Sequence, residues 1–383
     1  MKIGIDAKWL FSGNISGKLF IRNILPELFS LHPEIEWHIF LNEKEKSLYF
    51  PFRNENIYIH YVWAGFNMLS NLFVLSKFAK RLQLDVVLFQ TFSLKRKYFK
   101  SVVFIHDVLF KKYPEYFTLK ERLYFKPLKW TVRTADRIIT TSEYVKSDLE
   151  IFHYAKKDQP VDVVPSGITD IFKPVSFHNK EMLNKVKMKY DLPESYLLFV
   201  GRLNARKNIE TLIKSLHLLN DKSISLVIVG NKNWKFHTLN HLINKELGSR
   251  IFFTGEVTDD ELSKIYAMAK IFCFPSFAEG FGLPPLEAMA SGIPAIVSNT
   301  TSMPEVCGKA ALYVDPNNSK DIAEKITTLL ENRIIYEQKI KEGLEWAKNY
   351  TWRKTANGIM KSIFAALENE NRSINDGKKD KSN

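Results

Sequence analysis

Residues 271–292 read IFCFPSFAEGFGLPPLEAMASG, and this stretch predicts a strand, a loop and a helix in succession. The apolar run 271–276 is typical of a buried strand. The two consecutive prolines of the stretch suit the first turn of a helix, where backbone N–H groups have no partner within the helix. We therefore expect a loop over 277–282 and a helix that stops near Gly292. A strand that leads into a helix is the repeating unit of an α/β fold.

The loop region carries two glutamates, Glu279 within the loop and Glu287 one turn inside the expected helix. Gly280 and Gly282 would let backbone N–H groups approach a ligand closely, and the start of the helix adds a partial positive charge. This combination suits an anion flanked by hydroxyl groups, with phosphates on the N–H groups and sugar hydroxyls on the carboxylates. One alternative is an acid–base pair of glycosidase type. A simpler one is a loop charge together with a solvent-facing helix residue.

The same alternation of strands and helices recurs on both sides of this stretch. The expected strands are apolar on consecutive positions, so helices should cover both faces of a parallel sheet. We predict two doubly wound, Rossmann-like domains with ligands at the carboxyl ends of the strands and the main site in the cleft between the domains. Helices are expected at 208–219, 237–247, 259–269, 319–348 and 352–368. Strands are expected at 2–7, 36–42, 85–90, 101–107, 136–142, 161–167, 196–201, 225–230, 251–255, 271–276, 294–298 and 311–315.

Chain length and two polar segments define the expected domain boundaries. A chain of 383 residues is too long for one ordinary core. The Lys-rich segment 176–189 is the predicted linker, so we place one domain at 1–175 and the other at 190–351. Residues 369–383 contain almost no apolar side chains and are predicted to be a disordered tail.

Composition excludes several classes of protein. A hydrophobic content of 45% and a charged content of 25% are those of a globular protein. No apolar run reaches the roughly 18–20 residues that span a bilayer. Asp6 and Lys8 interrupt the N-terminal apolar run, which predicts a strand and not a signal peptide, so we expect a cytoplasmic protein. Cys273 and Cys307 are expected to be buried thiols, and no Cys/His cluster has metal-ligand spacing. No Asp-x-Asp loop stands in a plausible strand context, so no metal is predicted.

The formal net charge is +13, and basic residues of the N-terminal half are interleaved with aromatic ones. Nucleic acid, an anionic membrane surface or phosphorylated small molecules could each account for such a charge. Basic and aromatic residues on one helix suit an anionic lipid interface, whereas the simpler alternative is a solvated basic face. No known RNA-binding motif is present, so no nucleic-acid partner is predicted. The basic residues concerned are Lys95, Arg96, Lys97, Lys100, Lys111, Lys112, Lys120, Arg122, Lys126 and Lys129.

A second motif, FVGRLNARKNIETL at 199–212, places basic residues between a strand and a helix. Arg202, Arg206 and Lys207 would stand at the carboxyl end of the strand, where cations suit a diphosphate. The following helix, starting near Asn208, would add N–H groups that donate to the same anion. The alternative is an ordinary charged loop.

Taken in order, the segments GRLNARKN, GEVTDDEL, FAEGFGLPPLEAMASGIPAIVS and MPEVCGKAALYVDP resemble the retaining glycosyltransferases of family 4, which have the GT-B fold. Two glutamates with seven residues between them are the hallmark of that family, and Glu279 and Glu287 have this spacing. The N-terminal segments KIGIDA, VVFIHDVLFKKYPEYF, ADRIITTSEYVKSDL and VVPSGITDIFKP are also similar to it. The resemblance covers nearly the whole chain up to Glu368.

The resemblance implies roles for the motif residues. Arg202 and Lys207 would hold the diphosphate of the sugar donor, and Glu287 would bind the ribose hydroxyls. Glu279 would contact the donor sugar, and His106 would face that sugar from the N-terminal domain. The pair of glutamates would thus bind opposite ends of one nucleotide sugar rather than relay a proton. Further contacts would come from Val257, in the base pocket, and from the backbone of Gly280, Phe281, Gly282 and Leu283.

The resemblance also assigns the domains. Domain 1–175, joined by a returning helix at 352–368, would bind the acceptor, and domain 190–351 would bind the nucleotide sugar. The first loop departs from the family pattern, because SGKLFIRN has a single glycine, Gly17, where two are usual. The resemblance implies that Gly17 is the acceptor or phosphate contact of this loop. Ser166 stands where the family often has Asn.

The implied activity is metal-independent transfer of a hexose from a nucleotide diphosphate sugar, with anomeric retention. The N-terminal half is most similar to mannosyltransferases, so we expect GDP-mannose as donor, with a UDP-sugar as the alternative. The acceptor would be lipid-linked or an oligosaccharide, in O-antigen or capsule synthesis, with peripheral contact at the cytoplasmic face of the inner membrane. The rival hypotheses are a nucleotide-sugar epimerase or phosphorylase of the same architecture, a non-catalytic assembly scaffold, and a basic nucleic-acid binder.

Overall fold

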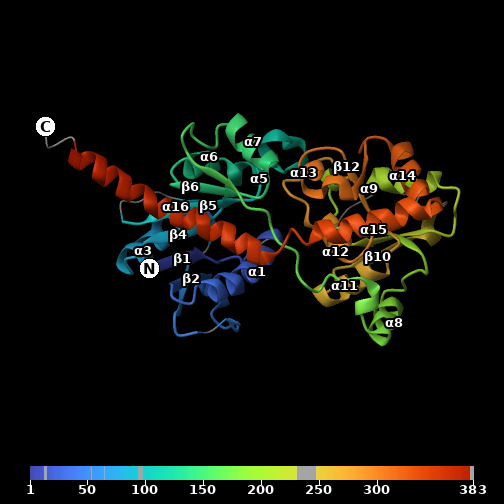
Figure 1. Cartoon of the computed structure of the whole chain (residues 1–383), viewed down its shortest axis with the longest axis horizontal. Helices are drawn as coiled ribbons and strands as arrows, with labels where there is room; N and C mark the ends of the chain where they lie inside the picture. The colour runs from blue at the N-terminus through green and yellow to red at the C-terminus, as the bar shows by residue number, and fades with distance from the viewer. Residues whose placement is uncertain (13–14, 53, 64, 94–97, 231–246, 380–383) are drawn as a thin grey trace. The chain divides into compact units, whose positions relative to one another are not determined.

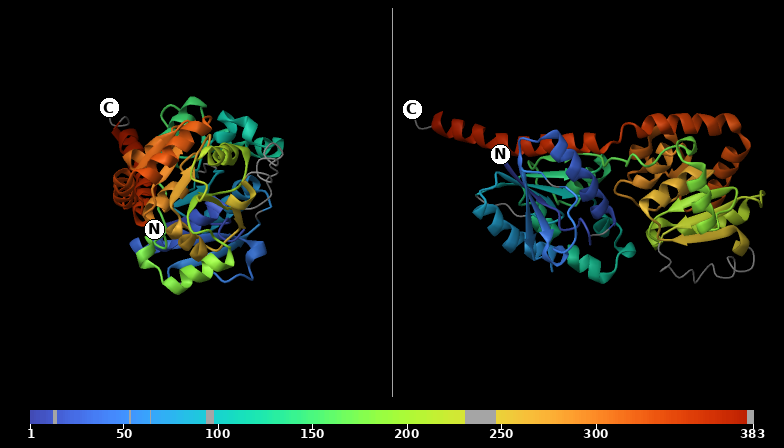
Figure 2. Two further views of the ribbon diagram at one scale, coloured as in Figure 1. Left: turned by 90° about the vertical axis from the view of Figure 1, so that its right-hand side faces the viewer. Right: turned by 90° about the horizontal axis from the view of Figure 1, so that it is seen from below.

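The computed structural model describes residues 1–379 except 13–14, 53, 64, 94–97 and 231–246. The chain divides into two compact units. The first comprises Met1–Gly167 together with the chain from Trp352 onward, and the second comprises Ile168–Thr351. Each unit is built on one parallel sheet with helices on both faces (Figure 1, Figure 2). The predicted fold class, α/β with two doubly wound Rossmann-like sheets, is confirmed.

The first unit contains a seven-stranded parallel sheet in the order β3-β2-β1-β4-β5-β6-β7. Helices α1 (Ile15–Leu31) and α16 (Trp352–Lys379) pack against each other on one face of this sheet. They bury side chains such as Phe20 and Ile359 against alternate residues of the strands. The chain therefore returns to its first unit at the end. The strands are β1 (Lys2–Asp6), β2 (Glu36–Asn42), β3 (Ile57–Val62), β4 (Val86–Gln90), β5 (Lys100–Ile105), β6 (Arg137–Thr140) and β7 (Val161–Val163).

Shorter helices supply the second layer of buried side chains in the first unit, including Leu75, Val132 and Leu149. Residues Ser70–Leu75 form a π-helical turn. The helix α5 starts with a reciprocal capping box in which Thr118 and Glu121 satisfy each other's backbone N–H groups. The helices of this part are α2 (Asn67–Leu69), α3 (Ser76–Arg81), α4 (Leu109–Lys112), α5 (Leu119–Phe125), α6 (Leu128–Val132) and α7 (Glu143–Ile151).

The second unit contains a six-stranded parallel sheet in the order β10-β9-β8-β11-β12-β13, and one apolar core surrounds it. Strand β8 pairs with both β9 and β11, so its carboxyl end lies in the middle of the sheet edge. The strands are β8 (Tyr196–Val200), β9 (Ser225–Val229), β10 (Ile251–Gly255), β11 (Ile271–Phe274), β12 (Ala295–Ser298) and β13 (Ala311–Val314). The helices are α8 (Lys180–Lys189), α9 (Ile209–Leu218), α11 (Asp259–Met268), α12 (Leu283–Ala290), α13 (Met303–Cys307), α14 (Ser319–Glu331) and α15 (Arg333–Ala347).

The segment 176–189, predicted to be a linker, is instead largely the helix α8 of the second unit. Asn179 caps this helix by accepting from the backbone N–H groups of Glu181 and Met182. Leu183 and Val186, three positions apart, are buried and face the core. Two apolar residues on one face are enough to dock a helix whose other positions are polar, and this is why composition alone suggested a linker.

Three further points separate the prediction from the structure: one strand that was not predicted, one helix that is longer than predicted, and one predicted helix that lies outside the described residues. Strand β3 was not predicted, because this edge strand mixes tyrosine and histidine with isoleucine and is only partly buried. The backbone of α16 stays helical to Lys379, beyond the expected end at Glu368, since no proline interrupts it. The helix expected at 237–247 falls almost entirely outside the described residues.

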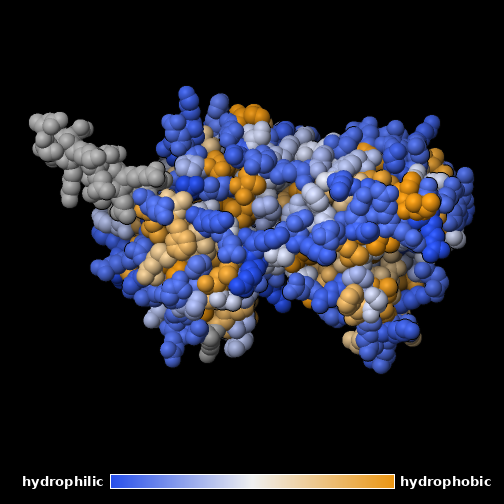
Figure 3. Space-filling view, in the orientation of Figure 1, coloured by the Kyte–Doolittle hydropathy of each residue, from blue (hydrophilic) through white to orange (hydrophobic). Residues whose placement is uncertain are grey.

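The surface drawn in Figure 3 is mostly hydrophilic, with small apolar patches on both units. Over the residues that the structure describes, no helix combines the length and the apolar character needed to cross a bilayer. Cys273 and Cys307 are buried free thiols, as predicted, and burial raises the pKa of each thiol above its usual value.

Candidate active site

Two neighbouring loops at the carboxyl edge of the second sheet form the candidate site. One follows β8, and the other follows β11, and these strands are hydrogen-bonded to each other. Asn208, buried with a left-handed φ of 54°, links the loops. Its side-chain amide donates to the carbonyl of Pro275 at 2.8 Å and to that of Pro316 at 2.6 Å. The bond from Asn208 to Pro275 therefore holds the two loops together.

Glu279 lies between two cations. Its carboxylate oxygens are each 2.8 Å from a nitrogen, Oε2 from Arg206 Nη1 and Oε1 from Lys207 Nζ. Only 8% of the Glu279 side chain is exposed. Burial opposes ionisation, but the charges of Arg206 and then Lys207 outweigh it and lower the pKa of Glu279 to about 2. Glu279 therefore stays ionised at neutral pH, and Arg206 and Lys207 both contact its carboxylate.

Side chains from the next loop hold the backbone around Glu279. Its N–H donates to Thr301 Oγ1 at 3.0 Å. The hydroxyl of Ser302 donates to the carbonyls of Glu279 and Phe281, each at 2.9 Å. The guanidinium of Arg206 also donates to the carbonyl of Ala278. These bonds fix where the Glu279 carboxylate points, which is the preorganisation that a binding site for a charged ligand needs.

The start of α12 differs from a typical anion site at a helix N-terminus. Gly282, at the N-cap, has a φ of 105°, and a Cβ there would lie 2.2 Å from the side chain of Met303. Glycine is therefore required at this turn. Pro284 and Pro285 have no N–H, so within the first three helical positions only Leu283 can donate to an anion. The start of α12 therefore offers an anion fewer N–H donors than a helix without these prolines, whereas the cationic side chains of Arg206 and Lys207 lie beside the same loop.

Glu287 lies on α12 and is also buried, with 8% of the residue exposed. The hydroxyl of Tyr266, from α11, donates to Glu287 Oε2 at 3.0 Å. Burial dominates and raises the pKa of Glu287 to about 7, although the bond from Tyr266 opposes this shift. The two glutamates of the motif therefore differ, because Glu279 is a permanent anion and Glu287 gains or loses a proton near neutral pH.

The other predicted residues of the second unit are placed differently. Arg202 is exposed and makes no ion pair within the described part of the chain. Arg206, which is part of the motif but received no role from the resemblance, lies beside Lys207 and Glu279. Val257 follows β10 and packs against the core of the unit. Its assignment to a base pocket stays a prediction.

His106 and Gly17 belong to the first unit. His106 follows β5 and is ringed by aromatic side chains, with centroids at 4.9 Å for Phe104, 5.6 Å for Phe20 and 6.5 Å for Trp9. Its Nε2 has no hydrogen-bond partner in the described structure, and burial lowers the pKa of His106 to about 4. Gly17 lies in the first turn of α1, because this helix begins at Ile15 and shortens the predicted loop.

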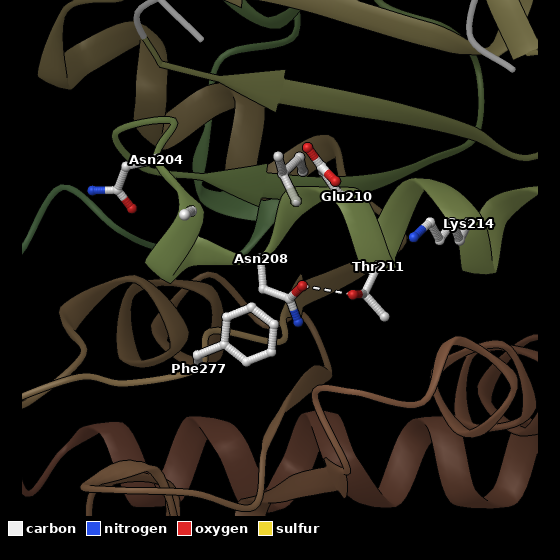
Figure 4. Close-up of a pocket in the computed structure, with 8 residues that line it drawn as sticks. Asn204, Asn208, Glu210, Thr211, Lys214 and Phe277 are labelled. Atoms are coloured by element: carbon white, nitrogen blue, oxygen red, sulfur yellow. Dashed lines mark hydrogen bonds between the residues drawn. The ribbon is translucent and has the colours of Figure 1, made fainter. Parts of the chain in front are cut away.

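A groove of about 290 Å³ adjoins the two loops on the side of α9 (Figure 4). The hydroxyl of Thr211 donates to Asn208 Oδ1 at 2.6 Å in this groove. Neither glutamate of the motif contributes to its wall, so the ion-paired cluster and not this groove defines the candidate site. The lining residues are Asn204, Ala205, Asn208, Ile209, Glu210, Thr211, Lys214 and Phe277.

Comparison with known proteins assigns the class. The family model described as glycosyl transferases group 1 matches residues 183–346, and the model described as glycosyltransferase family 4 matches residues 36–170. The chain is 34% identical to the O-antigen chain mannosyltransferase B of Escherichia coli over 272 residues, which are 68% of this chain and 69% of that one. The chain therefore belongs to the group 1, family 4 glycosyltransferases, and it is a hexosyltransferase.

Two further similarities agree with this assignment. The chain is 30% identical to the O-antigen chain mannosyltransferase RfbU of Salmonella typhimurium, over 68% of each protein. The structure of sucrose-phosphate synthase from Thermosynechococcus elongatus matches with a TM-score of 0.74 at 18% identity, covering 96% of this chain and all of that one. At this identity the structural match supports the fold, which is GT-B.

Proposed function

We propose that the protein transfers mannose from GDP-mannose, with retention of anomeric configuration, to a saccharide or lipid-linked acceptor in O-antigen or capsule synthesis. The observation that carries the proposal is the cluster of Glu279 with Arg206 and Lys207 at the carboxyl edge of the second sheet. Two cations and one oriented carboxylate suit a diphosphate that is attached to a sugar. The mannosyltransferase relatives support mannose as the transferred sugar.

In the proposed reaction, the bond between the anomeric carbon and the diphosphate oxygen breaks, and the acceptor oxygen bonds to the anomeric carbon on the same face. The proton of the acceptor hydroxyl passes to the departing diphosphate. Lys207 and Arg206, together with Arg202, would stabilise the negative charge that develops on this leaving group. Glu279 would bind hydroxyls of the transferred sugar, Glu287 those of the ribose, and His106 would face the sugar. No metal is required in this scheme.

The first test is a thermal-shift screen with GDP, UDP and their sugars. A ligand that binds only the folded protein raises the melting temperature, so we expect GDP and GDP-mannose to raise it. Transfer is then followed with labelled GDP-mannose, and the anomeric configuration of the product is read by NMR. Consumption of the nucleotide sugar with no acceptor present would favour an epimerase instead, and no shift with any nucleotide would contradict the proposal.

We also infer peripheral binding to an anionic membrane through α5 and α6. Leu119, Leu123 and Trp130 are 63%, 58% and 57% exposed. Apolar side chains surrounded by lysine and arginine match the chemistry of an anionic lipid surface. This location agrees with a lipid-linked acceptor at the cytoplasmic face of the inner membrane. The exposed side chains are Leu119, Lys120, Arg122, Leu123, Tyr124, Lys126 and Trp130.

Vesicle flotation tests the membrane contact. The full chain should float with vesicles containing phosphatidylglycerol and not with pure phosphatidylcholine. Leu123→Ser combined with Trp130→Ser should reduce the floating fraction severalfold, because apolar insertion is lost. Met188→Ser is a matched control, since Met188 is 82% exposed on α8 of the other unit. Equal flotation of the double variant and the control would contradict this role of α5 and α6.

A further inference from the structure

Gln90 is a buried side chain without a protein partner. It ends β4 and is 1% exposed, and neither its amide nitrogen nor its amide oxygen has a hydrogen-bond partner among the described residues. A buried polar group left without a partner destabilises the folded state. The next residue, Thr91, has a φ of 68°, which is unusual for a β-branched side chain. Unpaired polar groups and backbone strain in adjacent residues are features of functional sites.

A second unpartnered group lies on the neighbouring strand. Gln90 is paired in register with Phe104 of β5. Side chains two positions apart on a strand share a face, so Gln90, Phe104 and His106 all point to the face covered by α1. The Nε2 atom of His106 is buried and unpartnered there, within the structure as described. Trp9 stacks on the His106 ring with an interplanar angle of 26°.

The two unpartnered groups of this edge are uncharged. The Gln90 amide can both donate and accept, and the His106 ring is uncharged at neutral pH because burial lowers its pKa to about 4. The nearby charges at the end of β1 are matched, since Lys8 Nζ lies 2.7 Å from Asp6 Oδ1 and also donates to Asn71. A neutral amide and imidazole beside an indole ring suit a sugar, which has hydroxyl groups on its rim and C–H groups on its faces. A phosphate would call for unpaired cations instead.

We propose that Gln90 and Trp9, together with the edge of the His106 ring that does not face the transferred sugar, form a subsite for an uncharged saccharide of the acceptor, so that the group that receives the transferred sugar is a sugar hydroxyl and not the phosphate of a lipid carrier. Trp9 and His106 are partly exposed, so a saccharide would meet them first. Gln90 lies deeper and accepts from or donates to a saccharide hydroxyl. The inference rests on the proposed transferase function and specifies its acceptor.

The test compares two glutamines. Gln159 is a matched control, because its amide is satisfied by the carbonyls of Val132 at 2.9 Å and Ala135 at 2.8 Å. Gln90→Leu should leave the melting temperature unchanged or higher, whereas Gln159→Leu should lower it. With GDP bound, NMR saturation transfer to methyl α-mannoside and α-mannobiose should be seen in the wild type and in Gln159→Leu. It should fall at least fivefold in Gln90→Leu and in Trp9→Ala.

Several results would overturn the inference. These are no saturation transfer to either saccharide in the wild type, displacement of the saccharide by farnesyl monophosphate, or unchanged transfer in Gln90→Leu. Loss of stability in Gln90→Leu equal to that in Gln159→Leu would also overturn it, because a purely structural amide behaves in this way. The GDP thermal shift separates the two hypotheses. A wild type that binds neither GDP nor UDP contradicts the proposed function itself, whereas normal GDP binding with unaltered saccharide contact contradicts only the subsite.

Discussion

At the scale of single residues, Arg206 determines how Glu279 is charged and where it points. Arg206→Met removes one of its two cations and the bond to the carbonyl of Ala278. A hydrogen bond to a charged group is worth about 1.5–3 kcal/mol, so we predict a fall in kcat/KM of roughly 10–100-fold. The acid limb of the pH–activity profile should shift to higher pH, because the pKa of Glu279 rises when this cation is lost. Arg206→Lys keeps the charge and should restore the acid limb of the wild-type pH–activity profile. Equal activity of the wild type, Arg206→Met and Arg206→Lys would contradict this role.

Glu287 makes a separate prediction about pH. Its pKa in the folded protein, about 7, lies above that of an unfolded glutamate. Between these two pKa values the folded state holds a proton that the unfolded chain releases. The resulting contribution of Glu287 to the free energy of unfolding is complete below about pH 4. It is lost as the pH rises through 7. The loss amounts to roughly 3 kcal/mol. Glu287→Gln should flatten the melting temperature between pH 5 and 7, whereas Glu305→Gln, at an exposed position, should not; an unchanged slope would contradict the assigned burial effect.

Sequence reasoning located part of this site, for a physical reason. The spacing of Glu279 and Glu287 and the basic loop before α9 are local patterns, and both can be recognised along the chain. Tyr266 and Thr301 contact these glutamates from distant segments. Neither carries a local signal, since a buried tyrosine on a helix is most often only part of a core. Arg206 was visible in its motif, but the choice between Arg202 and Arg206 depends on how the loop turns.

At the scale of elements, Asn208 joins the loop after β8 to two other segments. Its amide bonds to the carbonyls of Pro275 and Pro316, and its left-handed backbone starts α9. Asn208→Ala should lower the free energy of unfolding by roughly 2–4 kcal/mol, because it leaves two buried carbonyls unpaired and adds strain. Asn208→Gly, which tolerates this φ, should be less destabilising by about 1 kcal/mol. Denaturant unfolding measures both, and equal losses would show that the conformation carries no strain.

Elements were predicted well where they are continuous and apolar. β2 and β10 occur with the expected bounds, since both are rich in apolar and aromatic residues and each ends where this pattern stops, at Asn42 and Gly255. α8 and β3 were not found, because α8 is apolar on one side only and the edge strand β3 mixes aromatic and histidine side chains with isoleucine. Whether a segment at the edge of a unit forms a helix or strand depends on the residues that cover it, and these are distant in the sequence.

At the scale of the whole molecule, α16 completes the first unit from the far end of the chain. Ile359 is fully buried between α16 and the sheet. Ile359→Asp places a charge in that core and should unfold the first unit or lower its melting temperature by more than 10 °C, since such burial costs several kcal/mol. The nucleotide-induced shift of the second unit should persist in calorimetry. Lys361→Asp is the control at an exposed position of the same helix; similar effects of both variants would contradict the packing.

The fold class could be predicted because two runs of alternating strands and helices leave few other arrangements for a chain of this length. The family could be recognised because its motifs are short, continuous segments whose residue types and spacing can be read along the chain. The donor nucleotide and the acceptor could not be derived in this way, since they depend on side chains that different loops bring together.

The central claim is that the cluster around Glu279 binds the diphosphate of a nucleotide sugar. Isothermal titration of GDP and GDP-mannose into the wild type and Lys207→Met tests it most directly. Lys207 lies 2.8 Å from Glu279 and over the ring of Phe274, so its ammonium group is held in a defined place within the cluster. We predict GDP binding to the wild type and a loss of affinity of at least tenfold in Lys207→Met, with its melting temperature in buffer little changed. Equal GDP affinity in the two proteins, or no binding of either nucleotide to the wild type, would contradict the claim.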